Sequence, residues 1–383
     1  MPTLCIAGSY FHTEKQGGVE TQTWQIGQIM ARSGWRVVYL CPTSGELGWQ
    51  LDDGSIGVYG FQQPNYGFQI ENSHIEKILQ EITPDVVYQR GRSILQESGA
   101  VIRYCKRKNI PYVFGLSSDA DTKLLHGITQ LSRAKQSLIK KSAIIPYGAW
   151  SDWKMRQTLR SADAIITQHL HQFELLPPSL HHKGVILPNL HPEITGTITK
   201  PPGATVAWIS NYRPLKRGEL FLQLAKQCSD LNATFIMILG NARQQYTAHL
   251  INQAAAISNL QIFGKCTPQH IDEILRSAWM LVNTSEYEGF SNVFIESWLR
   301  ETPTLSIGID PAEALSRHRA GIAAKDFPEL VRHVRHLLTH PDECRQLGQY
   351  ARVYGETNHG LQQNSNRIAE FFLNMPGKLG KAG

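Results

Sequence analysis

Residues 279–298 read Trp-Met-Leu-Val-Asn-Thr-Ser-Glu-Tyr-Glu-Gly-Phe-Ser-Asn-Val-Phe-Ile-Glu-Ser-Trp. An apolar run of strand length comes first, a polar loop follows, and an amphipathic helical pattern closes the stretch. A strand that leads through a loop into a helix is one unit of a parallel α/β sheet. This order predicts that the loop lies at the carboxyl edge of such a sheet, where ligands bind.

The same alternation of strands and helices extends over most of the 383 residues. Ahead of residue 191 the predicted strands are Leu4–Ala7, Arg36–Cys41, Ile56–Phe61, Asp85–Tyr88, Pro111–Gly115 and Ala164–Thr167. Beyond residue 204 they are Thr205–Ile209, Ala233–Leu239, Leu260–Phe263, Trp279–Asn283 and Thr304–Ile307. The stretch 192–204 is rich in turn residues and is typical of a linker. We therefore predict two doubly wound, Rossmann-like α/β domains, 1–191 and 205–355, that face a central cleft.

Composition limits the class of protein. The chain is 42% hydrophobic and 18% charged, which is ordinary for a globular protein. No window approaches the roughly 18 apolar residues of a membrane span, and the N-terminus lacks a secretory pattern, so we expect a cytoplasmic protein. The net charge of +6 falls well short of a nucleic-acid footprint, and we expect no nucleic-acid partner.

The excess of positive charge is local. From Arg103 to Arg160 there are twelve Lys and Arg residues against three acids. Two interpretations remain open: a solvated helix face, or a patch that attracts anionic lipid headgroups. The second would give a peripheral contact with the inner face of the cell membrane.

Two carboxylates eight positions apart mark the opening stretch. Glu288 belongs to the loop, and Glu296 lies about one turn into the helix. Glu296 can accept from a ribose diol, because a carboxylate offers only acceptors. The alternative is that both are ordinary acids near a helix start. Gly289 allows close approach of a ligand to the backbone, and anions suit the helix N-terminus formed by the amides of Phe290, Ser291 and Asn292.

This stretch resembles the Glu-x7-Glu motif of retaining GT-B glycosyltransferases of family 4, the glycosyl transferases group 1. The resemblance implies that Glu288 contacts the donor sugar and Glu296 the ribose. It also implies the GT-B fold, with a donor domain at 205–355, an acceptor domain at 1–191, and a helix at about 356–375 that crosses back onto the acceptor domain.

A second match, residues 208–221, resembles the family's diphosphate-binding segment, which usually reads Gly-Arg-Leu-x-x-x-Lys. Lys216 fits the family lysine, whereas Asn211 stands where the arginine is usual. Some members carry the arginine two places later. The resemblance therefore gives that role to Arg213, with Arg217 in reserve. Cations at a helix start are unfavourable unless an anion binds there.

A third match is Gly17-Gly18-Val19-Glu20, which resembles the family's Gly-Gly-x-Glu loop. The resemblance implies that the amides of Gly17 and Gly18 reach the donor diphosphate and that Glu20 lies on the acceptor side. Family members often carry a histidine after the strand 111–116, and this chain has none there. Ser118 or Asp119 would contact the sugar or acceptor instead.

The chain offers few metal-ligating patterns. Asp119-Ala-Asp121 matches the Asp-x-Asp of GT-A transferases, which binds a divalent ion. GT-B members use cationic side chains instead, so we expect no metal and no cofactor. His169-Leu-His171 and His181-His182 lack the context of a metal site, and we expect solvent or packing roles for them.

Together these features predict a metal-independent, hexosyltransferase-type enzyme (EC 2.4) that acts with retention. The donor would be a nucleotide-diphosphate sugar. The acceptor would be a saccharide or lipid-linked saccharide of cell-surface polysaccharide synthesis. Two alternatives remain open: a GT-B nucleotide-sugar epimerase, and a catalytically silent subunit that binds nucleotide sugar as a scaffold.

Overall fold

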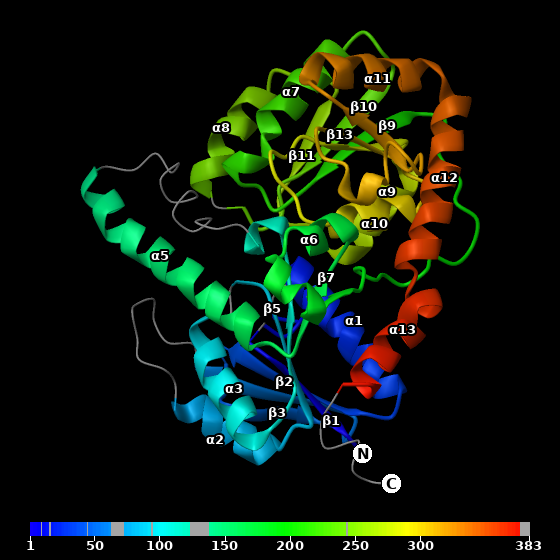
Figure 1. Cartoon of the computed structure of the whole chain (residues 1–383). Coiled ribbons are helices and arrows are strands. Elements are labelled where there is room, and N and C mark those ends of the chain that lie inside the picture. The colour runs from blue at the N-terminus through cyan, green and yellow to red at the C-terminus, as the bar shows by residue number, and fades with distance from the viewer. Residues whose placement is uncertain are drawn as a thin grey trace. The chain divides into compact units, whose positions relative to one another are not determined.

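The computed structural model describes residues 1–8, 10–14, 17–43, 45–62, 73–92, 95–122, 138–242 and 244–375, without the side chains of 73, 95–96, 138–147 and 244–246. The chain divides into two compact units (Figure 1). The N-terminal unit comprises Met1–Asn189 and Asn364–Gly383, and the C-terminal unit comprises Leu190–Gln363.

The N-terminal unit is built on an eight-stranded sheet with the order β3-β4-β2-β1-β5-β6-β7-β8. Every neighbouring pair is parallel except β3 and β4. The strands are β1 (Thr3–Ala7), β2 (Arg36–Thr43), β3 (Gly48–Asp52), β4 (Ile56–Gln62), β5 (Val86–Arg90), β6 (Tyr112–Gly115), β7 (Ala164–Thr167) and β8 (Gly184–Ile186). The six predicted strands are confirmed. The two additions are the exposed edge strand β3 and the three-residue β8.

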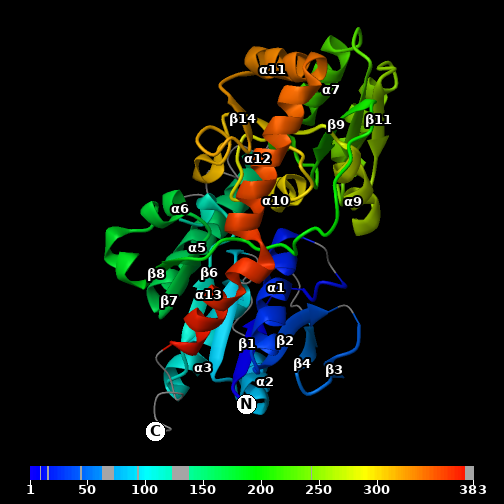
Figure 2. The ribbon, with the colours of Figure 1, turned by 90° about the vertical axis from the view of Figure 1, so that its right-hand side faces the viewer.

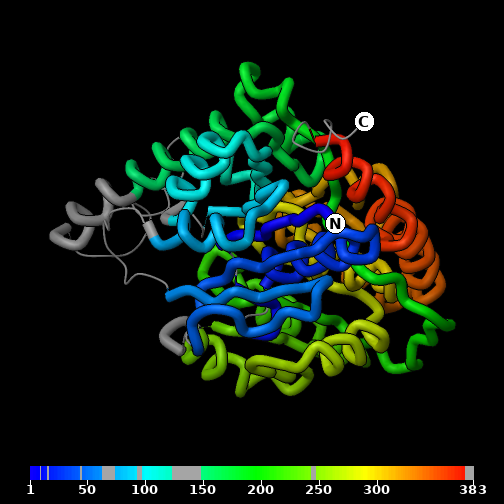
Figure 3. Tube along the Cα trace, turned by 90° about the horizontal axis from the view of Figure 1, so that it is seen from below, coloured from blue at the N-terminus to red at the C-terminus, as the bar shows by residue number. Residues whose placement is uncertain are grey.

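Helices cover both faces of this sheet. They are α1 (Gly18–Arg32), α2 (Ser73–Ile82), α3 (Leu95–Lys108), α5 (Leu138–Ser161), α6 (Leu170–Glu174) and α13 (Leu361–Leu373), with 3-10 turns η2 (Asp119–Asp121) and η3 (Pro178–Lys183). Helices α2, α3 and α5 share one core with Val38 and Phe114, and α2 and α3 lie side by side in Figure 3. Because strand side chains alternate, Tyr39 and Tyr88 face the other way. There the Tyr39 hydroxyl reaches the Thr23 carbonyl of α1, and Tyr88 packs against Phe372 of α13.

The C-terminal unit has a six-stranded, fully parallel sheet with the order β11-β10-β9-β12-β13-β14. The strands are β9 (Ala204–Ile209), β10 (Ala233–Ile238), β11 (Leu260–Phe263), β12 (Met280–Asn283), β13 (Thr304–Ile307) and β14 (Gly321–Ala324). The five predicted strands are confirmed. β14 was not predicted, since Gly-Ile-Ala-Ala has little β-branched character. Both units are thus doubly wound α/β domains.

Two layers of helices enclose this second sheet. They are α7 (Gly218–Gln227), α8 (Gln244–Ala254), α9 (Pro268–Ser277), α10 (Asn292–Trp298), α11 (Phe327–Thr339) and α12 (Pro341–His359), with 3-10 turns η4 (Pro214–Lys216) and η5 (Pro311–Glu313). One core joins α7, α8 and α11 to the sheet, and another joins α9, α10 and α12 to its opposite face. Figure 2 shows α12 running beside α10. None of the described helices combines the length and hydrophobicity that a bilayer crossing requires.

Each sheet has a point where the strand order reverses. In the C-terminal unit the chain winds outward from β9 through β10 and β11 on one side, and from β12 through β13 and β14 on the other. The loop after β9 leads to α7 on one face of the sheet, and the loop after β12 leads to α10 on the other. The carboxyl edge at such a point is where doubly wound sheets bind ligands. In the N-terminal unit the corresponding neighbours are β1 and β5.

Residues 190–204 pack into the C-terminal unit in the structure. Leu190 and His191 are buried. The Lys200 ammonium donates to the carbonyls of Leu275 and Arg300, at 3.1 and 2.7 Å. Within the predicted helix 356–375, α12 ends at His359, Gly360 is extended, and α13 follows.

Candidate functional site

Two predicted site residues meet at the switch point of the C-terminal sheet. Lys216 ends the η4 turn after β9, and Glu288 lies in the loop after β12. The Lys216 Nζ is 2.5 Å from Glu288 Oε1. The two side chains retain only 17% and 13% of their exposure. The result is a largely buried ion pair at the edge where a parallel sheet binds its ligand.

Ser285 and Asn283 hold the Glu288 carboxylate in place. The Ser285 hydroxyl lies 2.7 Å from Glu288 Oε1 and 2.8 Å from Asn283 Oδ1. A hydroxyl has one proton, so it donates to one of the two at a time. The Asn283 amide is oriented in turn by its bond to the Ser306 hydroxyl, 2.9 Å away. The carboxylate is therefore positioned through three buried polar residues: Ser285 in the loop, Asn283 on β12 and Ser306 on β13.

Hydrogen bonds also fix the loop that carries Lys216 to the loop that carries Glu288. The Thr284 hydroxyl donates to the Lys216 carbonyl at 2.7 Å and accepts from the Trp208 indole at 3.0 Å. The Glu286 amide donates to the Leu215 carbonyl at 2.8 Å. Sequence reasoning missed Thr284 and Ser285, because nothing in the sequence shows that β9 and β12 are neighbours.

Arg217 forms hydrogen bonds with backbone carbonyls of the loop that carries Glu288. Its own backbone is in the left-handed conformation, with φ at +47°, where η4 meets α7. Its Nε and Nη2 donate to the carbonyls of Thr284 and Ser285, at 2.6 and 3.1 Å. Arg213 differs: it is exposed, and its guanidinium has no hydrogen bond or ion pair with any residue that the structure describes. Arg213 is thus the arginine of this segment that is available to an anion. Asn211, which stands at the usual arginine position, accepts from the Asn241 amide at 2.8 Å.

The start of α10 places the remaining residues of the motif. Gly289 is half-buried, and Phe290 is buried against the rings of Trp298 and His359. Ser291 is the N-cap but its side chain makes no capping bond, so it satisfies none of the first amides of α10, which begin at Asn292. Phe290 therefore contributes packing and backbone to the site.

Glu296 keeps 31% of its side-chain exposure, yet the surrounding atoms remove enough water to raise its pKa to about 7. The positive charge of Arg300 opposes this rise. Near neutral pH the carboxyl therefore changes charge easily.

His191 faces Glu296 from the segment 190–204 and was not predicted. Its Nδ1 is 3.8 Å from Glu296 Oε1. Burial lowers the His191 pKa to about 3, against a hydrogen bond with Asn292 that raises it, so the ring is neutral. Its backbone is paired with α12 and α13: its amide donates to the His359 carbonyl and its carbonyl accepts from the Leu361 amide, both at 2.9 Å. Sequence reasoning missed His191, because the residue lies where turn residues begin.

An apolar pocket of about 200 Å³ lies at the same carboxyl edge, beyond β10 and β11. It is lined by Leu239, Gly240, Ala242, Thr247, Ile251, Ile262 and Gly264. Flat apolar groups suit such a lining.

In the N-terminal unit, Gly17 and Gly18 lie where β1 leads into α1. Gly17 is the extended N-cap, and Gly18 is the first helical residue. A Cβ at Gly17 would lie 2.5 Å from the Glu20 carboxylate, so glycine leaves room for that side chain to fold over the helix start. Glu20 is only 7% exposed. A carboxylate in the first turn stabilises a helix, which gives Glu20 a structural role whatever else it contacts.

The two aspartates after β6 have different surroundings. Asp121 is buried and accepts from Ser117 and Ser118, with Arg92 3.4 Å away. The Asp119 carboxylate, 22% exposed, lies 3.3 Å from His169 Nε2. Since Asp121 is committed to these partners, the pair does not present two open ligands for a metal.

Ser118 caps η2 by accepting from the Ala120 amide at 3.2 Å. His169, expected only to pack or face solvent, is buried after β7 and lies against Asp119. A histidine thus reaches this part of the sheet edge from the neighbouring strand.

The basic stretch is described only in part. Residues 123–137 and the side chains of Lys140 and Lys141 lie outside the described part of the chain. Arg103 and Arg107 both pair with Glu76 on α2, at 3.0 and 2.9 Å. On α5, Lys154 lies over the rings of Trp150 and Trp153, each 5.8 Å away, and Trp153 is 54% exposed.

Two doubly wound α/β units, each with loops at the carboxyl edge of its sheet, are typical of the GT-B architecture. Solved GT-B structures match the chain along nearly its whole length. Sucrose-phosphate synthase from Thermosynechococcus elongatus matches with a TM-score of 0.75 and 12% identity, over 97% of this chain and 98% of that one. HepE from Anabaena, in complex with UDP and glucose, matches with a TM-score of 0.70 and 15% identity, over 98% of this chain and 100% of that one.

Family comparison agrees with the fold. Residues 17–176 match the glycosyl transferase 4-like domain, and residues 198–354 match glycosyl transferases group 1. The chain belongs to the group 1 glycosyltransferases of the GT-B fold. A curated relative, glycosyltransferase 1 domain-containing protein 1 of Xenopus tropicalis, is 23% identical over 131 residues. The match covers 34% of this chain and 38% of the relative's length.

Proposed function

We propose that this nucleotide-sugar glycosyltransferase transfers a hexosyl group with retention of configuration at the anomeric carbon. The acceptor that we propose is a saccharide or lipid-linked saccharide of cell-surface polysaccharide synthesis. The observation that carries the proposal is the Lys216–Glu288 pair at the switch point, which sets a cation and a carboxylate side by side where a sugar diphosphate would bind.

The leaving group decides what the residues must do. Negative charge grows on the diphosphate as its bond to the anomeric carbon breaks, and preorganised cations stabilise that charge. An ammonium has three donors, so Lys216 can keep one bond to Glu288 and offer others to phosphate oxygens. Arg213 would add a second cation, and the first amides of α10 and of Gly17 and Gly18 would add neutral donors.

Glu288 and Glu296 would orient the rest of the donor. Glu288, held by Ser285, would accept from sugar hydroxyls. Glu296 in its ionised form would accept from the ribose diol. The nucleobase would occupy the apolar pocket beyond β10 and β11. On the acceptor side we propose Asp119, supported by its contact with His169, together with Ser118 and Glu20.

Retention would follow from attack on the face from which the diphosphate leaves. The bond from the anomeric carbon to the diphosphate oxygen breaks, and the acceptor oxygen bonds to the same face. The acceptor's proton passes to the leaving phosphate oxygen. This step needs no protein nucleophile and, with Lys216 and Arg213 as counter-charges, no metal ion.

Contact with an anionic membrane would bring the enzyme to a lipid-linked acceptor. Indole rings favour the membrane interface, and cations attract anionic headgroups. The exposed Trp153 and the neighbouring Lys154 of α5 have this chemistry. Flotation with phosphatidylserine vesicles tests the idea: Trp153→Ala and charge reversal at Lys106 and Lys108 should each weaken binding, and unchanged flotation of both variants would refute membrane contact.

Donor binding and chemistry can be tested separately. Thermal unfolding with UDP-, GDP-, ADP- and dTDP-sugars identifies the donor, because a selective ligand raises the midpoint by mass action. The identified donor is then incubated with acceptors, and the anomeric configuration of the product is read by NMR. An inverted product would refute retention.

The same reactions discriminate the two alternatives. Nucleotide release with an epimerised sugar and no acceptor would indicate an epimerase. Donor binding without turnover under any condition would indicate a scaffold. A transferase instead gives a glycosylated product whose formation depends on both donor and acceptor.

A further inference from the structure

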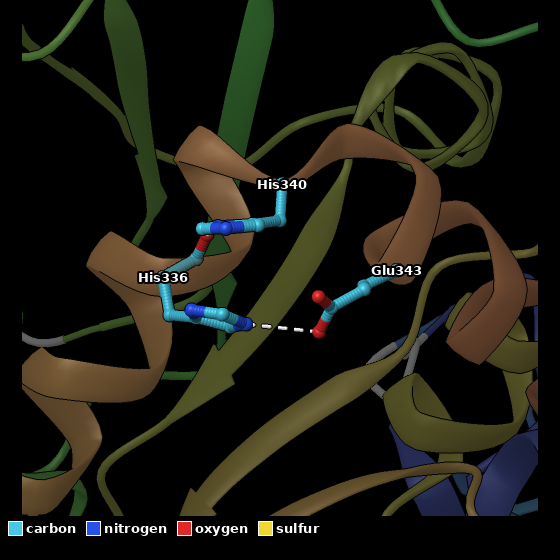
Figure 4. Close-up of side chains that lie close together, drawn as sticks. All are labelled: His336, His340 and Glu343. Carbon is cyan, nitrogen blue, oxygen red and sulfur yellow. Dashed lines mark hydrogen bonds and ion pairs between the residues drawn. The ribbon is translucent and has the colours of Figure 1, made fainter.

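We propose that His336, His340 and Glu343 form a binding site for a zinc-type divalent cation, separate from the sugar-transfer site. Figure 4 shows the three side chains close together where α11 ends and α12 begins. Each offers one ligand atom, and these atoms all lie within 4.8 Å of one another. Within the described residues they are the sole group of three such side chains this close.

The local fold explains why the three residues meet. His336 lies in the last turn of α11, and His340 follows the helix as its C-cap residue. Their rings stack with centroids 4.0 Å apart. The chain turns at His340, and Glu343 follows in the first turn of α12. The Glu343 Oε2 is then 2.8 Å from His336 Nε2.

The chemistry of the donor set indicates which ion fits. Two imidazoles and one carboxylate suit Zn²⁺ and its neighbours Ni²⁺, Co²⁺ and Cu²⁺, whereas Mg²⁺ prefers oxygen ligands alone. The Nδ1 of His340 lies 2.9 Å from the His336 carbonyl. In the tautomer that carries its proton on Nδ1, His340 donates to this carbonyl and keeps the lone pair of Nε2 for an ion. Such an outer partner is typical of histidines that bind metals.

The surroundings leave room for an ion, and buried residues fix the two helices that carry the ligands. His336 and Glu343 are 47% and 58% exposed, so an ion can enter and keep water in its remaining positions. The nearby cations are engaged elsewhere: Arg335 pairs with Asp230 and Arg345 with Asp342, both at 2.6 Å. Buried Leu337 anchors the last turns of α11, and buried Cys344 the first turn of α12. A bound ion would tie the two helices together at their junction.

Isothermal titration of the untagged, metal-stripped full chain with ZnCl₂ tests the site. We expect one ion per chain, and no heat of binding with MgCl₂. Loss even of an outer partner of a metal ligand costs about 10–100-fold in affinity, so His336→Ala and His340→Ala should each weaken binding at least about tenfold. The matched control is His333→Ala, a half-buried histidine of the same helix that faces Glu329, which should bind as the parent does.

A further variant makes the outcome decisive. Glu343→Gln keeps the shape of the side chain but removes its charge, so it should also weaken binding. No measurable Zn²⁺ binding by the parent protein would overturn the proposal. Equal binding by the parent and both histidine variants would do the same, because the ion would then lie elsewhere.

Discussion

Substitution of Lys216 by methionine tests the central pair most directly. Methionine keeps a similar length and removes the charge, the three donors and the 2.5 Å contact with Glu288. Loss of one preorganised donor to a developing anion costs about 2.7–4 kcal/mol, or about 10²–10³-fold in kcat. We therefore expect Lys216→Met to lower kcat by about that factor.

The free energy of unfolding should change much less. Breaking a fully buried ion pair costs about 3–5 kcal/mol, because the remaining charge loses its partner. Here both side chains keep some exposure, and Glu288 retains the Ser285 hydroxyl at 2.7 Å. A loss of about 1.5–2 kcal/mol follows, the lower end of what a hydrogen bond to a charged group contributes.

The assay is single-turnover transfer from the donor identified by thermal unfolding, with urea unfolding of the same samples. Lys226→Met, an exposed lysine in the last turn of α7, is the matched control and should leave both quantities unchanged. If Lys216→Met transfers sugar at close to the parental rate while losing stability, the pair is structural and the diphosphate role of Lys216 is refuted.

Three further predictions concern neighbouring residues. Arg217→Gly should be more stable to urea than Arg217→Ala by about 1 kcal/mol. Both variants lose the hydrogen bonds to Thr284 and Ser285, but only alanine keeps the strain of a left-handed backbone, about 1–2 kcal/mol. A glycine variant less stable than the alanine variant would contradict this strain. Donor KM should rise as pH falls below about 7 in the parent, because protonation of Glu296 removes an acceptor, and Glu296→Gln should abolish that dependence; a dependence that survives in Glu296→Gln would assign it to another group. Ser285→Ala should lower kcat about fivefold, because Glu288 loses one hydrogen bond that orients its carboxylate. An unchanged kcat would show that Lys216 alone positions Glu288.

Much of the fold follows from the sequence, for a simple reason. Strands that are buried on both faces read as apolar runs between turn residues, and eleven such runs were predicted and found. The missed strands lack that signal: β3 is an exposed edge, β8 has three residues, and β14 is small and glycine-led.

The candidate site was less accessible to sequence reasoning, because it depends on which strands are neighbours. Lys216 and Glu288 are 72 positions apart, and only the adjacency of β9 and β12 brings them together. Which arginine is available to an anion, Arg213 or Arg217, depends on the left-handed backbone of Arg217. That conformation favours glycine, so the residue type at 217 does not predict it. His191 reaches Glu296 because the segment 190–204 packs into the unit, a fact of tertiary structure.

The arrangement around Glu288 also says something about selectivity for the donor. Lys216 is already paired, so the two charges largely cancel until a ligand arrives. A small anion gains little, since it must compete with a carboxylate only 2.5 Å from the ammonium. A sugar diphosphate can compensate, because its sugar hydroxyls donate to Glu288 while its phosphates engage Lys216 and the exposed Arg213. The Lys216–Glu288 pair would thus bind tightly only a ligand that carries both sugar hydroxyls and phosphates. Inorganic phosphate or a nucleoside monophosphate should accordingly bind far more weakly than the intact donor. Glu288→Gln should reduce this difference in affinity, because it releases Lys216 for any anion. An unchanged difference in affinity would refute the argument.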